Sequence, residues 1–210
     1  MIVEWELFAT WLYCTDRSVH YNTLHEETSM PRIVPIDPTT ATGDTAAHLA
    51  SVRKMFGATP NLFTTAAHST AALGAMLGMF GNLGKASVGA RTGELIAIAI
   101  AQGNRCGYCL SAHTAIGRTI GLAPNALEAA RHAQSSDAKT AALLELATAI
   151  NRARGHIDDA TLARARAAGI TDTEVVESVA LVALNVFTNY LNTVAQTEID
   201  FPEVALSAAA

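Results

Sequence analysis

Signals that begin and end helices follow one another along most of this chain, and they restrict what it can fold into. From Met30 onward the sequence is rich in alanine, the best helix-forming residue, and its segments carry capping residues at their starts and glycines past their ends. Thr171 and Glu174 have the spacing of a capping box. The expected helices span residues 44–56, 61–80, 87–102 (capped by Ser87), 106–120, 124–132, 136–154, 158–168 and 171–196. The chain is therefore predicted to be all-α.

One segment fits a strand as well as a helix. The sequence LIAIAIA, residues 95–101, alternates large and small side chains in the two-residue period of a strand. Alanine is a poor strand former, however, and the surrounding segment is long enough for several helical turns. An isolated strand would also lack a partner, so we expect a helix here.

Length, charge and hydropathy limit the classes of protein to which the chain can belong. A chain of 210 residues is expected to form one domain with its own core. The net charge of −5, without a basic cluster, argues against nucleic acid as a partner. Apolar residues make up 50% of the sequence, yet no stretch approaches the roughly 18 uninterrupted apolar residues of a membrane span. The apolar excess indicates a tightly packed helical interior, an oligomer interface or both.

Cysteine content and the first residues indicate a cellular location. Three cysteines are too few and too irregularly spaced for a secreted disulfide framework. The first residues lack a basic segment and include Glu4 and Glu6, unlike a signal peptide. A cytoplasmic protein is therefore expected.

Residues 1–29 differ from the rest of the chain. They hold both tryptophans but only one alanine, and neither glycine nor proline. Two interpretations remain open: an N-terminal extension that packs on the surface, or a mis-assigned start, with translation beginning at Met30. Cys14 falls in this stretch and is assigned no role. Residues 30–210 are expected to form a single helical domain.

The chemistry of the chain concentrates in the sequence RCGYCLSAH, residues 105–113. If a helix begins at Cys106, its side chain and that of Cys109 lie on one face, about 5–6 Å apart at Cβ and within reach of a disulfide. A helix N-terminus also stabilises a thiolate and lowers the pKa of the thiol. His113 follows Cys109 by one turn, where it can exchange a proton with that sulfur directly or through water.

Glu94 is expected to face this motif. Gly103 and Asn104 form a strong break, so the helices on either side are expected to pair as an antiparallel hairpin. Glu94 lies ten residues before Asn104 and His113 nine residues after it, which places both about 13–15 Å from the turn. The hairpin therefore brings Glu94 level with His113. Glu94 is also the only acid in an apolar segment, where an ionisable group without a role is costly.

Other interpretations of the cysteine pair compete with a redox couple. Cys106, Cys109 and His113 can supply three ligands to a structural zinc ion, although a fourth ligand is not evident and such sites usually lie in loops. An iron–sulfur cluster needs more thiolates than the chain has, and a thioredoxin fold needs βαβ units. The spacing can also arise by chance among packed residues.

Glu94, Cys106, Cys109 and His113, separated by eleven, two and three residues, together resemble the core motif of the alkylhydroperoxidase D-like proteins. These belong to the carboxymuconolactone decarboxylase superfamily, and the sequence NVFTNYLNTVAQTEIDFP near the C-terminus resembles its peroxidase-related branch. The resemblance extends from about Met30 to the end of the chain. It implies a compact helical bundle whose central hairpin carries the two cysteines, and a homo-oligomer, often a trimer or hexamer.

The resemblance also implies a reaction and assigns roles in it. Carried over by position, Cys109 is the peroxide-attacking thiol, Cys106 resolves it into a disulfide, and Glu94 and His113 relay protons. The implied activity is reduction of hydroperoxides by a redox-active disulfide without a further cofactor, supported by an external thiol or lipoyl-type donor, with a peroxiredoxin among the candidate partners. Tyr108 stands where the best-studied members have a histidine, and is a candidate accessory residue.

Two alternatives to a peroxidase remain open. The protein can be a disulfide reductase that serves a separate peroxiredoxin, or a redox-responsive binding module whose disulfide alters an interface without turnover. The members that open or decarboxylate lactones typically lack paired cysteines, which disfavours that activity here.

Overall fold

The structure is organised around a hairpin of α5 (Ala90–Gly103) and α6 (Gly107–Thr119) and one long helix, α10 (Asp172–Ala195). The computed structural model describes residues 30–207. The remaining helices of this range are α2 (Gly43–Phe56), α3 (Asn61–Ala66), α4 (Thr70–Leu83), α7 (Pro124–Arg131), α8 (Ala138–Ala153) and α9 (Asp159–Ala167). Since the described range contains helices and no strand, the predicted all-α class is confirmed for it.

Two predictions about the ends of the chain stay predictions. The interpretations of residues 1–29, and the position of Cys14, lie outside the described residues. The helices of residues 30–207 share one buried core. The single domain over residues 30–210 stays a prediction.

Helix α5 lies at the centre because its middle is apolar on every side. All residues from Leu95 to Ala101 are buried, and Ile96, Ile98 and Ile100 are fully enclosed. The alanines between them let neighbouring helices approach closely, and α5 packs against α6, α7, α8 and α10. The ambiguous LIAIAIA segment is thus a helix, as predicted.

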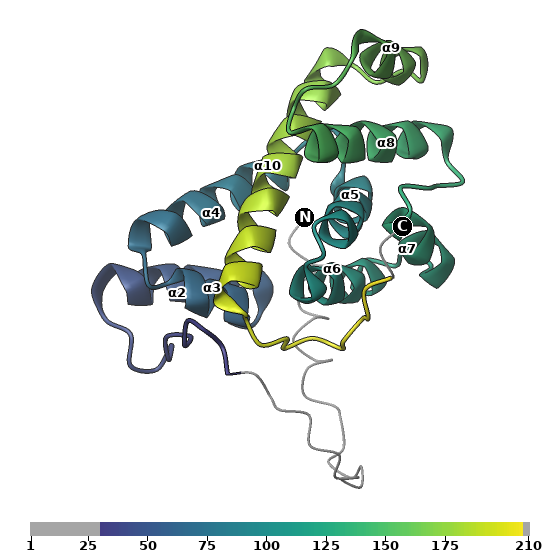
Figure 1. The fold of residues 1–210 in the computed structure, drawn as a ribbon. Helices are drawn as coiled ribbons and strands as arrows, with labels where there is room; N and C mark the ends of the chain where they lie inside the picture. Colours follow the sequence, from purple (N-terminus) through teal and green to yellow (C-terminus); the bar gives the residue numbers. More distant parts are fainter. Residues whose placement is uncertain (1–29, 208–210) are drawn as a thin grey trace, which may run out of the picture.

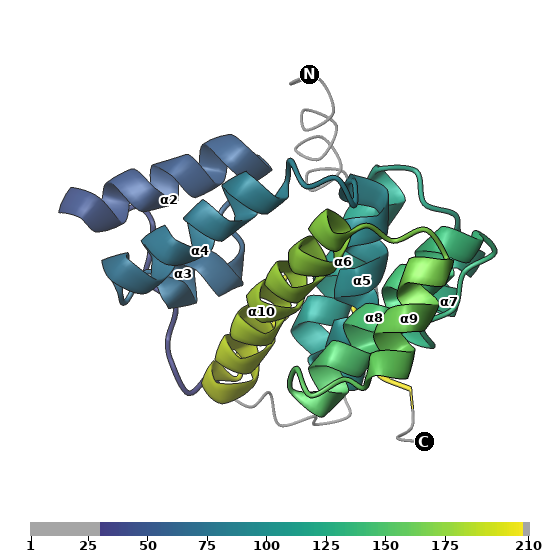
Figure 2. The ribbon, with the colours of Figure 1, turned by 90° about the horizontal axis from the view of Figure 1, so that it is seen from above.

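Helix α10 runs between two groups of helices. On one side lie α2, α3 and α4, and on the other α5 to α9, as two perpendicular views of the ribbon show (Figure 1, Figure 2). It packs against α3 and α4 of the first group and α5, α6 and α8 of the second. Because both sides are covered, its polar residues Asn185, Asn189 and Asn192 are buried. Side-chain amides are thereby carried into the interior beside α6.

The composition of α10 also matches that of a membrane-crossing helix. Within residues 30–207 it is the one helix long and apolar enough for that role. Half of the apolar stretch is buried inside the bundle, and its first turn carries Asp172 and Glu174. Packing within the bundle accounts for the buried half of this apolar stretch.

Several predicted helix starts are confirmed by their caps. The Thr171 hydroxyl accepts from the amide of Glu174, whose carboxylate accepts from the Thr171 amide, so the expected capping box is present. Asp158 caps α9 by accepting from the amide of Thr161 at 2.8 Å. Pro124 opens α7 in the first turn.

The single helix expected over residues 61–80 is wrong, because the chain forms two helices there. Helix α3 ends at Ala66, and α4 begins at Thr70 after a turn. Ser69 caps α4 by accepting from the amide of Ala72 at 3.1 Å. A serine inside an apolar pattern thus starts a new helix, because its hydroxyl competes for backbone amides.

The predicted cap of α5 is also wrong. Ser87 lies before the helix, which begins only at Ala90, after Gly89 with a φ of 80°. Ser87 is instead bound by Glu177 of α10, whose carboxylate accepts from the Ser87 amide at 3.0 Å and from its hydroxyl at 2.6 Å. The left-handed backbone at Gly89 delays the helix, and a long-range contact uses the serine.

The segment after α10 crosses the start of α6 (Figure 1). Val204 donates its amide to the hydroxyl of Ser111 at 3.0 Å, and the ring of Phe201 meets that of Tyr108 edge-on at 5.7 Å. Arg131 of α7 donates to the carbonyl of Ala205 at 2.8 Å. These contacts hold the segment against the end of α6 that carries the cysteines.

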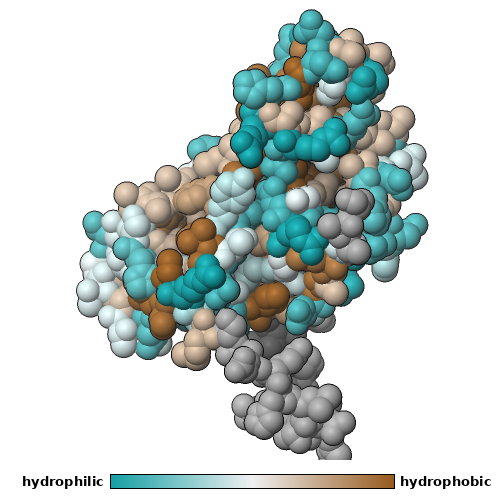
Figure 3. All heavy atoms as spheres, in the orientation of Figure 1, coloured by the Kyte–Doolittle hydropathy of each residue, from teal (hydrophilic) through white to brown (hydrophobic). Residues whose placement is uncertain are grey.

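The surface facing the viewer in Figure 3 is uneven in polarity. Hydrophilic side chains gather over the end formed by α8 and α9, and strongly hydrophobic ones appear over the half formed by α2, α3, α4 and α10. The exposed large apolar residues of α10 are Val176, Val179, Tyr190 and Val194. Exposed apolar side chains therefore occur near both ends of α10.

We expect Gly117→Ala to destabilise the protein. The added methyl group would stand 2.6 Å from Leu127 Cδ2 and 3.2 Å from Leu122 Cδ1, and both leucines are buried. Displacing them should lower the free energy of unfolding by about 1–2 kcal/mol. Denaturant unfolding measures the change.

Gly78→Ala on α4 is the matched control. Nothing lies within 4 Å of its added methyl group, so the higher helix propensity of alanine should raise the free energy of unfolding by about 0.5–1 kcal/mol. Equal effects of the two substitutions would contradict the close packing of α6 against α7.

Candidate active site

Cys106 stands at the start of α6 as its N-cap. Its backbone is extended, with φ −91° and ψ 95°, and its sulfur accepts from the amide of Cys109 at 3.2 Å. Arg105 before it has a φ of 57°, which turns the chain sharply after α5. The first amides of a helix lack intrahelical partners and carry partial positive charge. A sulfur in this position is stabilised in its thiolate form.

The pKa of Cys106 lies below the usual value of a thiol. The largest cause is the hydrogen bond from the Cys109 side chain, and the Cys109 amide and the charge of His113 act in the same direction. Burial acts against them, because the residue is only 2% exposed. Of the two thiols, Cys106 is therefore the one favoured to hold a negative charge at rest.

Cys109 follows in the first turn of α6 and has the opposite tendency. Burial raises its pKa well above the usual value, and the neighbouring Cys106 sulfur adds to this. The amides of Asn192 and Asn189 act in the other direction. Both cysteines are buried free thiols. The pair is thus arranged to share one proton, with the thiol of Cys109 donating to the thiolate of Cys106.

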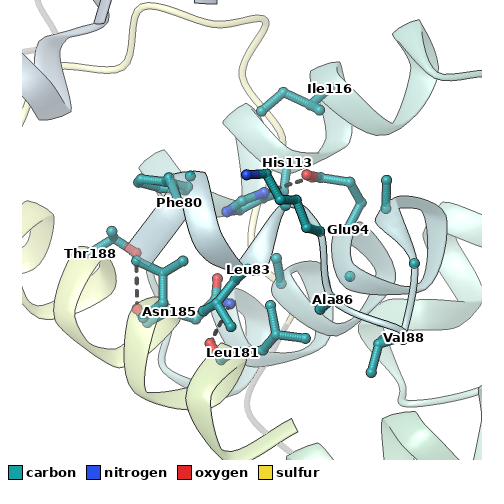
Figure 4. A pocket seen from close by; sticks show the side chains of 18 of the residues that line it. Phe80, Leu83, Ala86, Val88, Glu94, His113, Ile116, Leu181, Asn185 and Thr188 are labelled. Atoms are coloured by element: carbon teal, nitrogen blue, oxygen red, sulfur yellow. Dashed lines mark hydrogen bonds and ion pairs between the residues drawn. The ribbon is translucent and has the colours of Figure 1, made fainter. Parts of the chain in front are cut away.

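Glu94 of α5 meets His113 of α6 as the hairpin predicts. The Nδ1 atom of His113 lies 2.8 Å from Oε2 of Glu94, and the two side chains are 15% and 21% exposed. Figure 4 shows the pair at one wall of a cavity, opposite Asn185 and Thr188 of α10. The predicted register is therefore confirmed, while the roles of the two residues stay predictions.

Two opposing effects act on the imidazole of His113. Burial disfavours its charged form, but the negative charge of Glu94 and the hydrogen bond to it outweigh burial and raise the pKa of His113 above its usual value. Cys106 acts in the same direction as Glu94. With Nδ1 held by the carboxylate, Nε2 is the ring nitrogen left to exchange a proton with a bound molecule.

Two adjoining cavities reach these residues. The larger, of about 380 Å³, is lined mainly by apolar side chains and reaches Glu94 and His113. The smaller, of about 50 Å³, is lined by Cys109, Tyr108 and His113 among others. The walls that both cavities share are Phe56, Phe80, His113, Ile116 and Thr188. His113 thus stands between a roomy apolar space and a small space beside the Cys109 sulfur.

Tyr108 lines the small cavity, but its hydroxyl group is engaged elsewhere. The hydroxyl oxygen accepts from the amide of Leu62 at 3.0 Å, and the hydroxyl also bonds to the carboxylate of Asp200. Burial is the main reason that the pKa of Tyr108 is raised. The side chain ties α3 and the C-terminal segment to α6, and its accessory role stays a prediction.

Sequence reasoning favoured packing as the role of NVFTNYLN in α10, with Asn189 or Tyr190 as the residues that could approach the thiols, and it did not name Asn192. Asn192 donates from Nδ2 to the Cys109 sulfur at 3.3 Å. It lies 83 positions from Cys109 along the chain, so no local spacing links the two residues. The signal available in the sequence was the repeated asparagine in NVFTNYLN, whose Asn189 and Asn192 share one helix face.

The zinc interpretation requires at least one further ligand near the cysteines. Within residues 30–207, no group of three or more His, Cys, Asp or Glu side chains is placed to hold a metal ion. From α10, the amide nitrogen of Asn192 donates to the Cys109 sulfur, and an amide nitrogen is not a zinc ligand. The residues present do not fit a structural zinc site.

Comparison with known proteins agrees with this arrangement. Residues 70–147 match the model of the carboxymuconolactone decarboxylase family, a range that includes Glu94, both cysteines and His113. The chain contains a carboxymuconolactone decarboxylase family domain. In residue terms the domain spans α4 to α7 and part of α8. No curated protein matches the sequence significantly.

Solved structures share the fold of this carboxymuconolactone decarboxylase domain and its flanking helices. An uncharacterized peroxidase-related protein from Silicibacter sp. TM1040 is 22% identical, with a TM-score of 0.71 over 82% of this chain and 93% of that chain. An uncharacterized peroxidase-related protein with an alkylhydroperoxidase AhpD core, from Ralstonia eutropha JMP134, is 21% identical, with a TM-score of 0.73 over 81% and 92%. The debrominase Bmp8, in complex with 2,3,4-tribromopyrrole, is 20% identical, with a TM-score of 0.68 over 80% and 91%. These similarities establish the alkylhydroperoxidase D-like fold.

We expect Glu94→Gln to lower the pKa of His113 from above 6.5 to below it. Without the carboxylate charge, burial becomes the dominant effect on the imidazole, and a change of about one unit or more is typical of losing such a partner. NMR titration of the His113 ring gives the pKa directly. Because the folded-state pKa is raised, the stability gained from the pair should be full below pH 6.5 and fade as pH rises through the folded-state value.

Glu145→Gln is the matched control, because that exposed carboxylate pairs with Arg164 on α9. It should leave the titration of His113 unchanged. An unaltered titration in Glu94→Gln as well would contradict the contact between the two side chains.

Proposed function

We propose that this protein reduces hydroperoxides by cycling Cys106 and Cys109 between dithiol and disulfide. The observation that carries the proposal is the small cavity that brings the Cys109 sulfur and His113 to one space. A nucleophile and a proton donor therefore face the same bound group, as attack on an O–O bond requires.

The two cavities suit two different parts of a hydroperoxide substrate. About 50 Å³ beside Cys109 holds a group the size of one or two water molecules, which suits a peroxide. About 380 Å³ of mainly apolar space beyond His113 suits an organic group attached to that peroxide. The arrangement supports an organic hydroperoxide as substrate.

The first step oxidises Cys109. Its proton passes along the hydrogen bond to the Cys106 thiolate, and the Cys109 thiolate attacks one peroxide oxygen. The O–O bond breaks, the leaving oxygen takes a proton from His113, and an alcohol is released. Cys109 is left as a sulfenic acid.

The second step forms the disulfide and frees the site. The Cys106 sulfur attacks the Cys109 sulfur, and the sulfenic hydroxyl leaves as water with the proton of Cys106. An external dithiol then reduces the disulfide by exchange, and its own sulfurs become a disulfide. In sum, one hydroperoxide and one dithiol give an alcohol, water and an oxidised donor.

The remaining partners are also proposals. A thiol or lipoyl-type dithiol is the expected electron donor. The alternative activity that the same cysteine pair would support is that of a disulfide reductase serving a peroxiredoxin.

We expect a homo-oligomer, since exposed apolar side chains recur along α10, at Val176, Val179, Tyr190 and Val194. A cytoplasmic location fits the free thiols of the pair.

Reductive dehalogenation of a halogenated aromatic compound is a second candidate function. The similarity in fold to a debrominase bound to a tribromopyrrole, in a variant with one cysteine replaced by alanine, favours it. Phe56 and Phe80 line the cavities here and suit an aromatic ring. The electrons balance in the same way, because a dithiol and an aryl bromide give the arene, hydrogen bromide and a disulfide.

We expect purified protein to consume cumene hydroperoxide in the presence of dithiothreitol, and Cys109→Ser to lower kcat/KM by about 10³-fold or more, because the nucleophile is lost. Cys14→Ser is the control and should keep the wild-type rate. Mass spectrometry of peroxide-treated protein should find a Cys106–Cys109 link.

Peroxide consumption and bromide release, measured on the same protein, separate the candidate functions. Bromide release from a bromopyrrole without peroxide consumption would favour dehalogenation. Peroxide turnover that persists in Cys109→Ser would refute the mechanism, and turnover that requires an added peroxiredoxin would favour the reductase.

A further inference from the structure

Two asparagines of α10 lie beside the Cys109 sulfur. Asn189 and Asn192 are three residues apart, so they share one face of the helix, and both are buried. The amide nitrogen of Asn192 donates to the Cys109 sulfur at 3.3 Å. This sulfur therefore has a side-chain donor from a helix that the cysteine motif does not include.

A chain of amides orients Asn189 toward the same place. Asn151 of α8 donates from Nδ2 to Oδ1 of Asn104 at 2.8 Å, and Asn104 donates to Oδ1 of Asn189 at 3.0 Å. Because each oxygen accepts and each nitrogen donates, the NH₂ group at the end of the chain belongs to Asn189. That group favours the charged form of Cys109. Asn104 and Asn151 are thus positioning residues for Asn189.

The amides around the sulfur are incompletely paired. Within residues 30–207, Nδ2 of Asn189 and Oδ1 of Asn192 are buried without a hydrogen-bond partner of good geometry. An unpaired buried polar atom costs stability. A negatively charged Cys109 sulfur would accept a hydrogen bond from the unpaired NH₂ group of Asn189, and it would strengthen the hydrogen bond from Asn192.

The backbone amide closest in sequence to the Cys109 sulfur is already engaged. The amide of Cys109 itself is directed to the Cys106 sulfur. Asn192 lies in the last turn of α10, and the carbonyl end of a helix carries partial negative charge, which disfavours an anion nearby. The side-chain amides of Asn189 and Asn192 therefore act together with the positive end of α6 against burial and the carbonyl end of α10.

We infer that Asn189 and Asn192 form a thiolate hole that stabilises the negative charge on Cys109 once its proton has moved to Cys106. Asn192 is then a catalytic residue, because it touches the attacking sulfur. The inference rests on the proposed function for the identity of the nucleophile, but its physical content is measurable on the thiol alone.

The test is a titration of Cys109 in a Cys106→Ser background, which removes the coupling between the two thiols. The rate of alkylation by iodoacetamide is followed against pH, with mass spectrometry of the peptide that contains Cys109. Asn192→Leu should raise the pKa of Cys109 by about one unit and slow its alkylation at pH 7 about tenfold, and Asn189→Leu should act in the same direction. Asn104→Leu should give a smaller rise, since it frees Asn189 to turn.

Asn185→Leu is the matched control for this titration. It removes a buried amide from the same helix, one that donates to the carbonyl of Leu181 at 2.9 Å, and should leave the pKa of Cys109 unchanged. Asn192→Ser is the second variant if the leucine perturbs folding. Serine keeps a polar group at this position, but its side chain is too short to reach the Cys109 sulfur, which the asparagine amide contacts at 3.3 Å.

The outcomes separate this inference from the proposed function. An unchanged pKa of Cys109 in Asn192→Leu and Asn192→Ser alike overturns the thiolate hole, even if the wild-type protein consumes peroxide. Raised pKa values in a protein that consumes no peroxide support the thiolate hole and refute the peroxidase.

Discussion

The antiparallel contact between α5 and α6 is the constraint on which the site depends. A short turn joins the two helices, and their register sets Nδ1 of His113 at 2.8 Å from Oε2 of Glu94. A carboxylate or an imidazolium alone would be costly in this half-buried place, but each stabilises the charge of the other. Because α5 is enclosed on every side between Leu95 and Ala101, the hairpin cannot slide without disrupting the core.

The same hairpin gives two chemically identical thiols different properties. Cys106 caps α6 and accepts an amide hydrogen bond, whereas Cys109 lies in the first turn, where burial dominates. The pKa values of the two thiols are thereby moved in opposite directions. Such a pair holds one proton between its sulfurs, and the sulfur next to the cavity can become the anion when that proton shifts.

Helix α10 connects the large cavity to the sulfurs. Its residues Asn185 and Thr188 line the large cavity, and Asn189 and Asn192 one turn further on reach the thiol region. One helix therefore lines the large cavity and also contacts the Cys109 sulfur. A helix held on both sides by other helices keeps these groups at fixed distances.

The sequence by itself determined the all-α class, the central hairpin and the pairing of Glu94 with His113, because helical spacing and chain length from the turn fix them locally. It placed one helix where α3 and α4 stand, because the apolar pattern runs on past the Ser69 cap. It assigned Ser87 to a cap, because the contact of Ser87 with Glu177 joins residues 90 positions apart. Only the tertiary structure decided which thiol is favoured as the anion and that amides of α10 reach Cys109. Those features arise from burial and from contacts between residues far apart in the chain, which no local spacing encodes.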